Sequence, residues 1–161
     1  MAGPGKCLLV TGPPVRLEKE VREWGSRWSR WTAVQLPSHP PPFPESLRWP
    51  TVGKYKVDVA SFESLALPEL QVREDTDLFI VDEVGKMELF SSSFFPCVLR
   101  ILESNVPFLA TVPIPKFGRD IPAVARLKNH PGATMFTLSK GNRDAVKEEI
   151  YSHLVALLSK Q

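Results

Sequence analysis

Short apolar runs alternate with stretches of helical periodicity along most of the chain. Runs of four to six residues that are bounded by polar or turn residues are typical of buried strands, and a period of two indicates a strand with one buried face. By these criteria five segments predict strands: residues 6–11, 55–59, 77–83, 107–112 and 134–138.

Apolar residues at helical spacing predict helices in the intervening stretches. The first begins at Ser61, whose hydroxyl is a plausible cap. The predicted helices cover residues 61–70, 94–102, 123–128 and 142–158. This alternation of strand and helix predicts an α/β fold in which helices flank a parallel sheet. Ligands of such sheets bind beyond the carboxyl ends of the strands, where Thr11, Glu83, Val112 and Ser139 are expected.

Composition limits the class of protein but does not indicate a specific function. A chain of 161 residues with 43% hydrophobic residues is most simply one domain, residues 1–161, with a globular core. A net charge of +2 gives no case for nucleic-acid binding. Cys7 and Cys97 are too few for a disulfide framework, which favours a reduced, intracellular and cytoplasmic setting. No run of about 18 apolar residues exists, so we expect no membrane span, no secretory signal and a monomer.

The strand over residues 77–83 carries the most informative chemistry, because its apolar run ends in Asp82 and Glu83. In phosphate-transferring enzymes an acid at such a strand end binds magnesium, and a neighbouring acid orients the attacking water. A strand that merely ends in two solvated carboxylates is an equally weighted alternative. Lys86, four residues after Asp82, either faces a phosphate or is simply solvated.

The first strand leads into Thr11, Gly12, Pro13 and Pro14, which resemble the start of a phosphate-binding loop. The spacing GxxxxGK[ST] places a second glycine, a lysine and a hydroxyl after Gly12. The sequence has Leu17, Glu18 and Lys19 at those positions. Glutamate reverses the charge that should meet phosphate, and a one-residue slip to Lys19 is disfavoured because Arg16 and Leu17 lack the freedom of glycine. Taken alone, the four residues also fit a turn that ends a strand.

Several segments together resemble the THEP-type family of small P-loop nucleoside-triphosphatases. The run VDEVGKMELF is similar to the family's VIDEIGKMELF, and VGKYKVDVASFESLALP, TVPIPK and SKGNR echo VGQYVVDLTSFEQLALP, TIPVPK and TKENR. These matching runs lie at residues 81–90, 52–68, 111–116 and 139–143, and the resemblance as a whole covers about residues 1–14 and 52–161.

This resemblance implies a RecA-like parallel sheet, a magnesium cofactor, and slow hydrolysis of ATP, GTP and other nucleoside triphosphates to diphosphate and phosphate. By position, Asp82 would act on magnesium and Glu83 on water. The remaining residues implied at the nucleotide are Thr11, Gly12, Pro13, Pro14, Gly85, Lys86, Asn142 and Arg143. Asn142 and Arg143 would lie near the base or ribose.

The chain departs from the family between residues 15 and 51. The family reads TGPPGVGKTT, whereas TGPP is followed here by Val15, and residues 24–51 show no family resemblance. We interpret this as a skipped exon after Pro14 followed by a stretch read in a shifted frame. Translating the transcript in the other two frames tests the idea. The expected consequence is severely weakened triphosphate binding.

The atypical segment, residues 15–51, is rich in Trp and Pro; we expect it to be irregular, and it supports competing interpretations. Leu17, Val21, Trp24, Trp28 and Trp31 would form one stripe if the segment were helical. Such a helix could bind a membrane surface or a partner, cover the sheet, or belong to a disordered insert. The prolines of residues 37–44 fit either an SH3 or WW ligand or a linker. The competing class of function is therefore a non-catalytic isoform or binding protein that acts through this segment.

Overall fold

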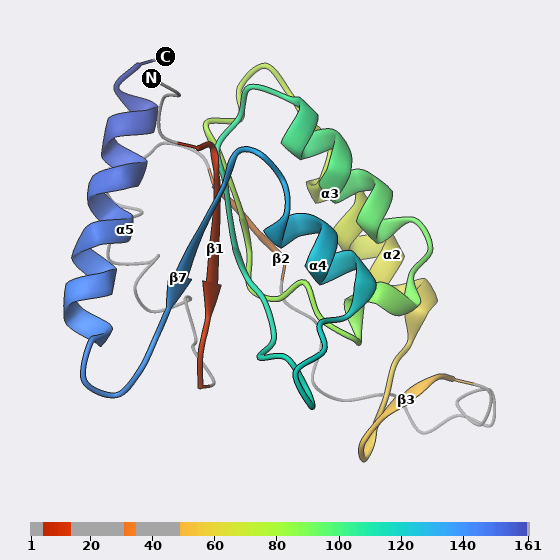
Figure 1. The fold of residues 1–161 in the computed structure, drawn as a ribbon. Helices are drawn as coiled ribbons and strands as arrows, with labels where there is room; N and C mark the ends of the chain where they lie inside the picture. The colour runs from red at the N-terminus through yellow and green to blue at the C-terminus, as the bar shows by residue number, and fades with distance from the viewer. Residues whose placement is uncertain (1–4, 14–30, 35–48, 161) are drawn as a thin grey trace.

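The computed structural model describes residues 5–13, 31–34 and 49–160, drawn in colour in Figure 1. Within them, two small antiparallel strands and a five-stranded sheet are connected by helices. In chain order the elements are β1 (Cys7–Thr11), β2 (Trp31–Val34), β3 (Thr51–Val52), β4 (Tyr55–Lys56), α2 (Val59–Glu69), β5 (Leu78–Val81), the 3₁₀ turn η3 (Glu88–Phe90), α3 (Phe94–Glu103), β6 (Phe108–Thr111), α4 (Pro122–Lys128), β7 (Ala133–Thr137) and α5 (Arg143–Leu158).

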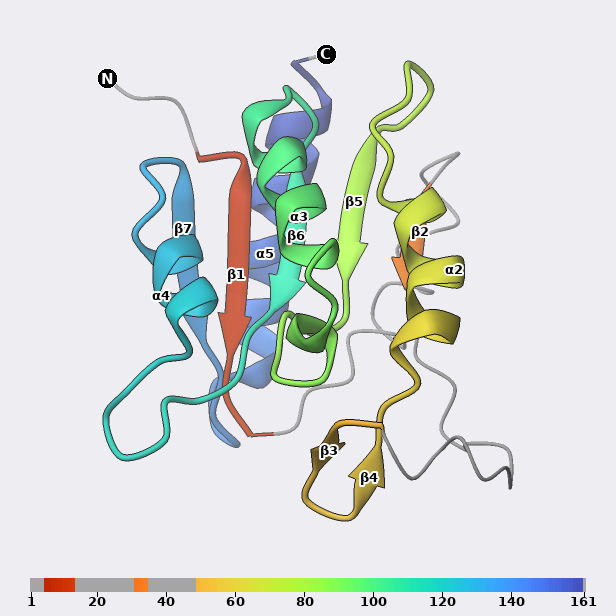
Figure 2. The ribbon, with the colours of Figure 1, turned by 90° about the vertical axis from the view of Figure 1, so that its right-hand side faces the viewer.

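The main sheet has the strand order β2-β5-β6-β1-β7, and every neighbouring pair is parallel. The carboxyl ends of all five strands therefore lie at one edge, which is the lower edge in Figures 1 and 2. This arrangement confirms the predicted α/β fold with a parallel sheet flanked by helices. Because β6 lies between β5 and β1, the strand that leads to the two acids and the strand that leads to Gly12 share one neighbour.

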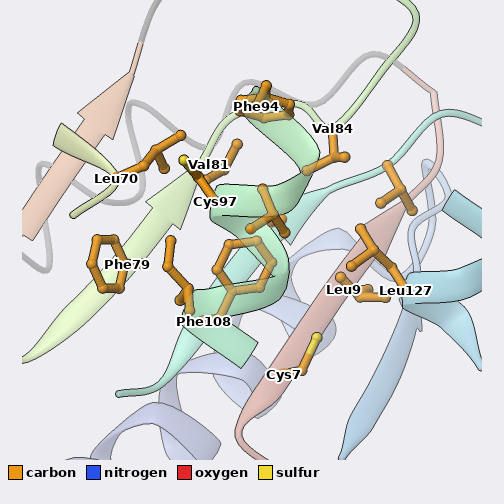
Figure 3. Close-up of a cluster of buried hydrophobic side chains, with 14 of the residues drawn as sticks. Cys7, Leu9, Leu70, Phe79, Val81, Val84, Phe94, Cys97, Phe108 and Leu127 are labelled. Atoms are coloured by element: carbon orange, nitrogen blue, oxygen red, sulfur yellow. The ribbon is translucent and has the colours of Figure 1, made fainter. Parts of the chain in front are cut away.

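Helices cover both faces of the sheet (Figures 1 and 2). Helices α2, α3 and α4 lie on one face and α5 lies on the other. Each face has its own apolar cluster, and Figure 3 shows the one on the three-helix face, to which Phe79 of β5, Phe94 of α3 and Phe108 of β6 all belong. Burying one such side chain stabilises the fold by roughly 1.5–3 kcal/mol. No helix among the described residues combines the length and the apolar character needed to cross a bilayer.

The structure corrects the prediction for residues 55–59 and for the start of the next helix. β4 ends at Lys56, and α2 begins at Val59 rather than at Ser61. Asp58 is the cap, since its carboxylate accepts the backbone N–H of Ser61 at 3.0 Å and also the Ser61 hydroxyl. The period-two pattern continued past Lys56, but an Asp at an N-cap ends the extended backbone there.

Part of the segment that we expected to be irregular is a strand. Trp31 begins β2, which pairs in parallel with β5 over four residues. The proposed helical stripe therefore cannot extend through Trp31, because pairing with β5 requires extended backbone there. Residues 14–30 and 35–48 lie outside the described residues, and so do Pro14, most of the stripe and the proline-rich run.

Candidate functional site

The end of β6 holds together the two halves of the candidate site. The Thr111 hydroxyl donates to the carbonyl oxygen of Asp82 at 2.6 Å, and the Thr111 carbonyl accepts from the N–H of Val84 at 2.9 Å. One residue later, the N–H of Val112 donates to the carbonyl of Val10 at 2.9 Å. We call residues 82–88, which follow β5, the acidic turn. The backbone of the acidic turn and the end of β1 are thus both hydrogen-bonded to the end of β6. Sequence reasoning missed Thr111, whose only signal was a buried threonine at the end of an apolar run.

Asp82 and Glu83 follow β5 at this edge, as the sequence predicted. Asp82 is half-buried, whereas Glu83 is exposed. The pKa of Glu83 is nevertheless raised, first because the surrounding protein partly desolvates its carboxyl and second because the charge of Asp82 repels its own. A carboxylate with a raised pKa is a better proton acceptor near neutral pH than a fully solvated one.

Gly85 gives the Glu83 side chain the space it occupies. A Cβ built on Gly85 would lie 2.5 Å from Glu83 Oε1, which is closer than side-chain atoms approach one another. The Gly85 backbone is itself fixed, because its N–H donates to Glu88 Oε2 at 3.0 Å and its carbonyl accepts from the N–H of Leu89 at 3.1 Å. The turn after β5 therefore sets the position of the Glu83 carboxyl.

Glu88 is the second site residue that sequence reasoning missed. Its carboxyl is half-buried beneath the turn, and its pKa is raised to about 7. Burial is the largest cause, and the charges of Glu83 and Asp82 add to it, while the hydrogen bond from Gly85 acts in the opposite direction. The signal in the sequence was a glutamate three residues after Gly85, at a distance that a tight turn can bridge.

At the end of β1, the described part of the expected phosphate loop packs against β7. The Thr11 carbonyl accepts from the N–H of Leu138 at 2.7 Å, and a Cβ on Gly12 would lie 2.8 Å from both the Cβ and the carbonyl oxygen of Leu138. Gly12 is therefore required by packing as well as expected for phosphate binding. The buried Thr11 Oγ1 has no hydrogen-bond partner among the described residues. Pro13 is exposed, and Pro14 lies outside the described residues.

Asn142 lies at the same edge, in the connection from β7 to α5. Its side-chain oxygen accepts from the N–H of Ser139 at 2.7 Å, and its amide donates to the carbonyl of Thr137 at 3.0 Å. The side chain therefore braces this loop. Arg143 begins α5 and is exposed, and Lys86 is exposed in the acidic turn.

The acids at the sheet edge have the chemistry of a magnesium site in which a bound nucleotide supplies some of the ligands. Mg²⁺ prefers oxygen and is usually held by one or two carboxylates, waters and substrate phosphates. Within residues 5–13, 31–34 and 49–160, no three His, Cys, Asp or Glu side chains are close enough to form a metal cage. The half-buried Asp82 at the end of β5 supplies one carboxylate of the kind that Mg²⁺ accepts beside waters and substrate phosphates.

Comparisons of the sequence and of the structure with known proteins all find nucleoside-triphosphatases. The family model described as "NTPase" matches residues 18–151, a range that includes the segment 24–51 in which we found no resemblance by motif. The bovine (Bos taurus) protein named cancer-related nucleoside-triphosphatase homolog is 34% identical over 178 residues, which cover 94% of this chain and 92% of the relative. This alignment is longer than the 161 residues of the chain, so the bovine protein carries residues that this chain lacks.

Two solved structures are similar to this one over most of its length. The crystal structure of THEP1 from the hyperthermophile Aquifex aeolicus has a TM-score of 0.68 at 29% identity, and it covers 92% of this chain and 98% of the neighbour. The solution structure of a human cancer-related nucleoside triphosphatase has a TM-score of 0.64 at 27% identity, with coverages of 91% and 95%.

Proposed function

Since this chain belongs to the NTPase family, whose bovine and human relatives are named nucleoside-triphosphatases, and has the P-loop NTPase fold, we propose that it hydrolyses ATP, GTP and other nucleoside triphosphates to diphosphate and phosphate with magnesium. The observation that carries the proposal is the meeting of two strand ends across β6. Thr111 and Val112 tie the turn of Asp82 and Glu83 to the end of β1, where the phosphate loop begins.

We assign different roles to the two acids. Asp82 is the protein ligand of magnesium, which when bound neutralises charge on the phosphate oxygens. Glu83 orients the attacking water and accepts its proton. The raised pKa of Glu83 supports this role, and Gly85 supports it by leaving room for the carboxyl. Thr111 is a positioning residue, because it acts through the backbone of Asp82.

The remaining nucleotide contacts are proposed from position. Thr11, Gly12, Pro13 and Pro14 form what remains of the phosphate loop. Gly85 and Lys86 lie in the acidic turn, and Lys86 is exposed and able to meet a phosphate. Asn142 and Arg143 lie at the end of β7, beside the β1 end. Asn142 contributes there by fixing the loop, since its side chain is already engaged.

We further propose that triphosphate binding is severely weakened in this chain. Leu17, Glu18 and Lys19 stand where the loop requires glycine, lysine and a hydroxyl. Backbone N–H groups of a glycine-rich loop and its lysine normally supply most of the phosphate contacts. The site therefore keeps its hydrolytic acids with a reduced capacity to hold substrate, so the deficit should be expressed mainly in KM.

Phosphate release from Mg-ATP and Mg-GTP by the full chain tests the function. We expect slow turnover that needs millimolar nucleotide, stops when EDTA removes magnesium, and falls at least 100-fold in Glu83→Gln. Glu103→Gln, which alters an exposed acid on α3, is the matched control and should leave turnover unchanged. Turnover that survives Glu83→Gln would refute the role of Glu83. Complete absence of turnover would favour a binding protein that acts through residues 15–51.

Gly85→Ala tests the positioning of Glu83 without removing its carboxyl. The added methyl must displace the end of the Glu83 side chain, which can move, so the fold should be retained. A misplacement on the order of 1 Å lowers turnover by roughly 100-fold. We expect a fall in kcat with the urea unfolding midpoint nearly unchanged. Equal kcat in Gly85→Ala and the parent chain would contradict the assignment.

A further inference from the structure

The loop between β6 and α4 carries a hydrogen-bonded hairpin with an unusual tip. Lys116 and Arg119 pair with each other, the Lys116 N–H donating at 3.1 Å and the Arg119 N–H donating at 2.9 Å. Phe117 and Gly118 form the turn with φ angles of 51° and 72°. We call residues 116–119 the aromatic hairpin.

Phe117 is both strained and completely exposed. Positive φ is rare for a bulky residue and costs about 1–3 kcal/mol where it persists, and Phe117 is the only non-glycine residue that adopts it within residues 5–13, 31–34 and 49–160. Its relative exposure of 103% means that the ring packs on nothing in the described structure. The backbone is therefore strained at the residue whose aromatic ring is exposed to solvent. Backbone strain of this kind is concentrated at active sites and ligand-binding sites.

The base of the aromatic hairpin is held firmly. Asp120 forms an ion pair with Lys128 of α4 at 2.7 Å, and both side chains are largely shielded from water, with exposures of 23% and 18%. This contact ties the hairpin to a helix whose residues Val124 and Leu127 are part of the core. Phe117 is thus presented from a fixed base.

The hairpin emerges at the candidate site. Its strand, β6, ends between the β5 and β1 ends, and Val112 is bonded to Val10 at that edge. The five steps along the chain from Val112 to Phe117 can span at most about 18 Å. Figures 1 and 2 show the β6–α4 loop projecting beyond the carboxyl edge of the sheet, the edge at which ligands of such sheets bind.

We propose that the aromatic hairpin is a nucleotide-binding element, in which the Phe117 ring stacks on the base of the bound nucleoside triphosphate and Lys116 and Arg119 offset the charge of its phosphates. The inference rests on the function proposed above and adds a base contact to it. Stacking on a ring tolerates every base, because each base has a π-face, which fits hydrolysis of several nucleoside triphosphates. Cations on both sides of the ring favour a ligand that is aromatic and anionic over an apolar protein surface.

The test is an NMR titration of the full chain with each of two ligands, added up to millimolar concentration. Mg-ATP has a base, whereas magnesium tripolyphosphate has phosphates alone. Phe117→Ala should weaken the binding of Mg-ATP by about 5- to 100-fold and change the affinity for magnesium tripolyphosphate by less than about twofold. Phe117→Tyr should restore Mg-ATP binding. Lys116→Ala combined with Arg119→Ala should weaken both ligands, and Leu65→Ala, which removes an exposed side chain from α2, is the matched control.

The outcomes separate this inference from the proposed function. If Phe117→Ala binds Mg-ATP as well as the parent chain, the base contact is refuted and the proposed function stands. If Phe117→Ala weakens both ligands equally and Phe117→Tyr restores neither, the residue is structural and the inference is refuted. If the parent chain binds neither ligand, the proposed function and this inference fail together.

Discussion

Glu88 links the electrostatics of the acidic turn to the stability of the protein. Its pKa rises from 4.5 to about 7 because burial and two neighbouring carboxylates disfavour its charged form. The folded protein therefore holds a proton on Glu88 over a pH range in which the unfolded chain has lost it. The unfolding free energy must then decrease as pH rises from about 4.5 to about 7. Above about pH 7 the Glu88 carboxyl is ionised in both states, so it adds little further pH dependence.

Glu88→Gln should remove this pH dependence while keeping an oxygen to accept the Gly85 N–H. Relative to the variant, the parent chain should lose up to roughly 3 kcal/mol of unfolding free energy between pH 4 and pH 8, since each pKa unit corresponds to about 1.4 kcal/mol. Urea unfolding at several pH values measures the difference. Glu103→Gln is the control for general charge effects. A difference between parent and Glu88→Gln that does not vary with pH would contradict the shifted pKa.

At the residue scale, the sequence located the acids at the strand end but not their supports. Asp82 and Glu83 were found because a short apolar run followed by two acids has a defined place in a parallel sheet. Glu88 and Thr111 were missed because their contacts depend on geometry that no spacing rule contains. The Glu88 carboxylate accepts from the N–H of Gly85 across a tight turn. The Thr111 hydroxyl donates to the carbonyl of Asp82, which follows the neighbouring strand β5.

At the element scale, Ser91 connects the acidic turn to two helices. It is 2% exposed, and its hydroxyl oxygen accepts from the N–H of Phe94 at 3.1 Å, in the first turn of α3. The same hydroxyl donates to the Glu63 carboxylate on α2. Ser93, which immediately precedes α3, makes no capping hydrogen bond with its side chain, so Ser91 supplies that function.

Ser91→Ala should therefore destabilise the fold by about 1–3 kcal/mol, the range for a lost helix cap that leaves the buried N–H of Phe94 without its acceptor. The measurement is the urea unfolding free energy at pH 7. Ser92→Ala is the matched control, because Ser92 is exposed and adjacent, and it should change stability by less than about 0.5 kcal/mol. Equal stability of the two variants would show that the Ser91 bonds contribute nothing net.

The elements that sequence patterns predicted well are the buried ones. Strands β5 and β6 and helices α3 and α5 lie within one or two residues of their predicted bounds, because core burial enforces their periodicity. The prediction failed at residues 55–59, where the two-residue strand β4 ends before the Asp58 cap. It failed again at β2, whose strand is stabilised by pairing with β5, a partner that is remote in sequence.

At the scale of the whole molecule, the sheet does not depend on an intact phosphate loop. β1 is hydrogen-bonded to β6 on one side and to β7 on the other, and Leu8, Leu9 and Val10 are fully buried. The residues that cradle phosphate in such proteins belong to the loop after this strand and not to its core. A chain can therefore lose the second glycine, the lysine and the hydroxyl and still form the parallel sheet that places Asp82 and Glu83.

This separation of fold from ligand binding predicts how weakly nucleotide should stabilise the chain. A ligand at its dissociation constant adds about 0.4 kcal/mol to the unfolding free energy, whereas a ligand at 1,000 times that constant adds about 4.1 kcal/mol. If the lost loop raises the dissociation constant to about 1 mM, then 1 mM Mg-ATP should raise the thermal midpoint by no more than about 1–2 °C. Magnesium with inorganic phosphate at matched ionic strength controls for salt. A rise of about 8 °C or more would mean micromolar affinity. Phosphate binding would then come from residues outside the usual loop.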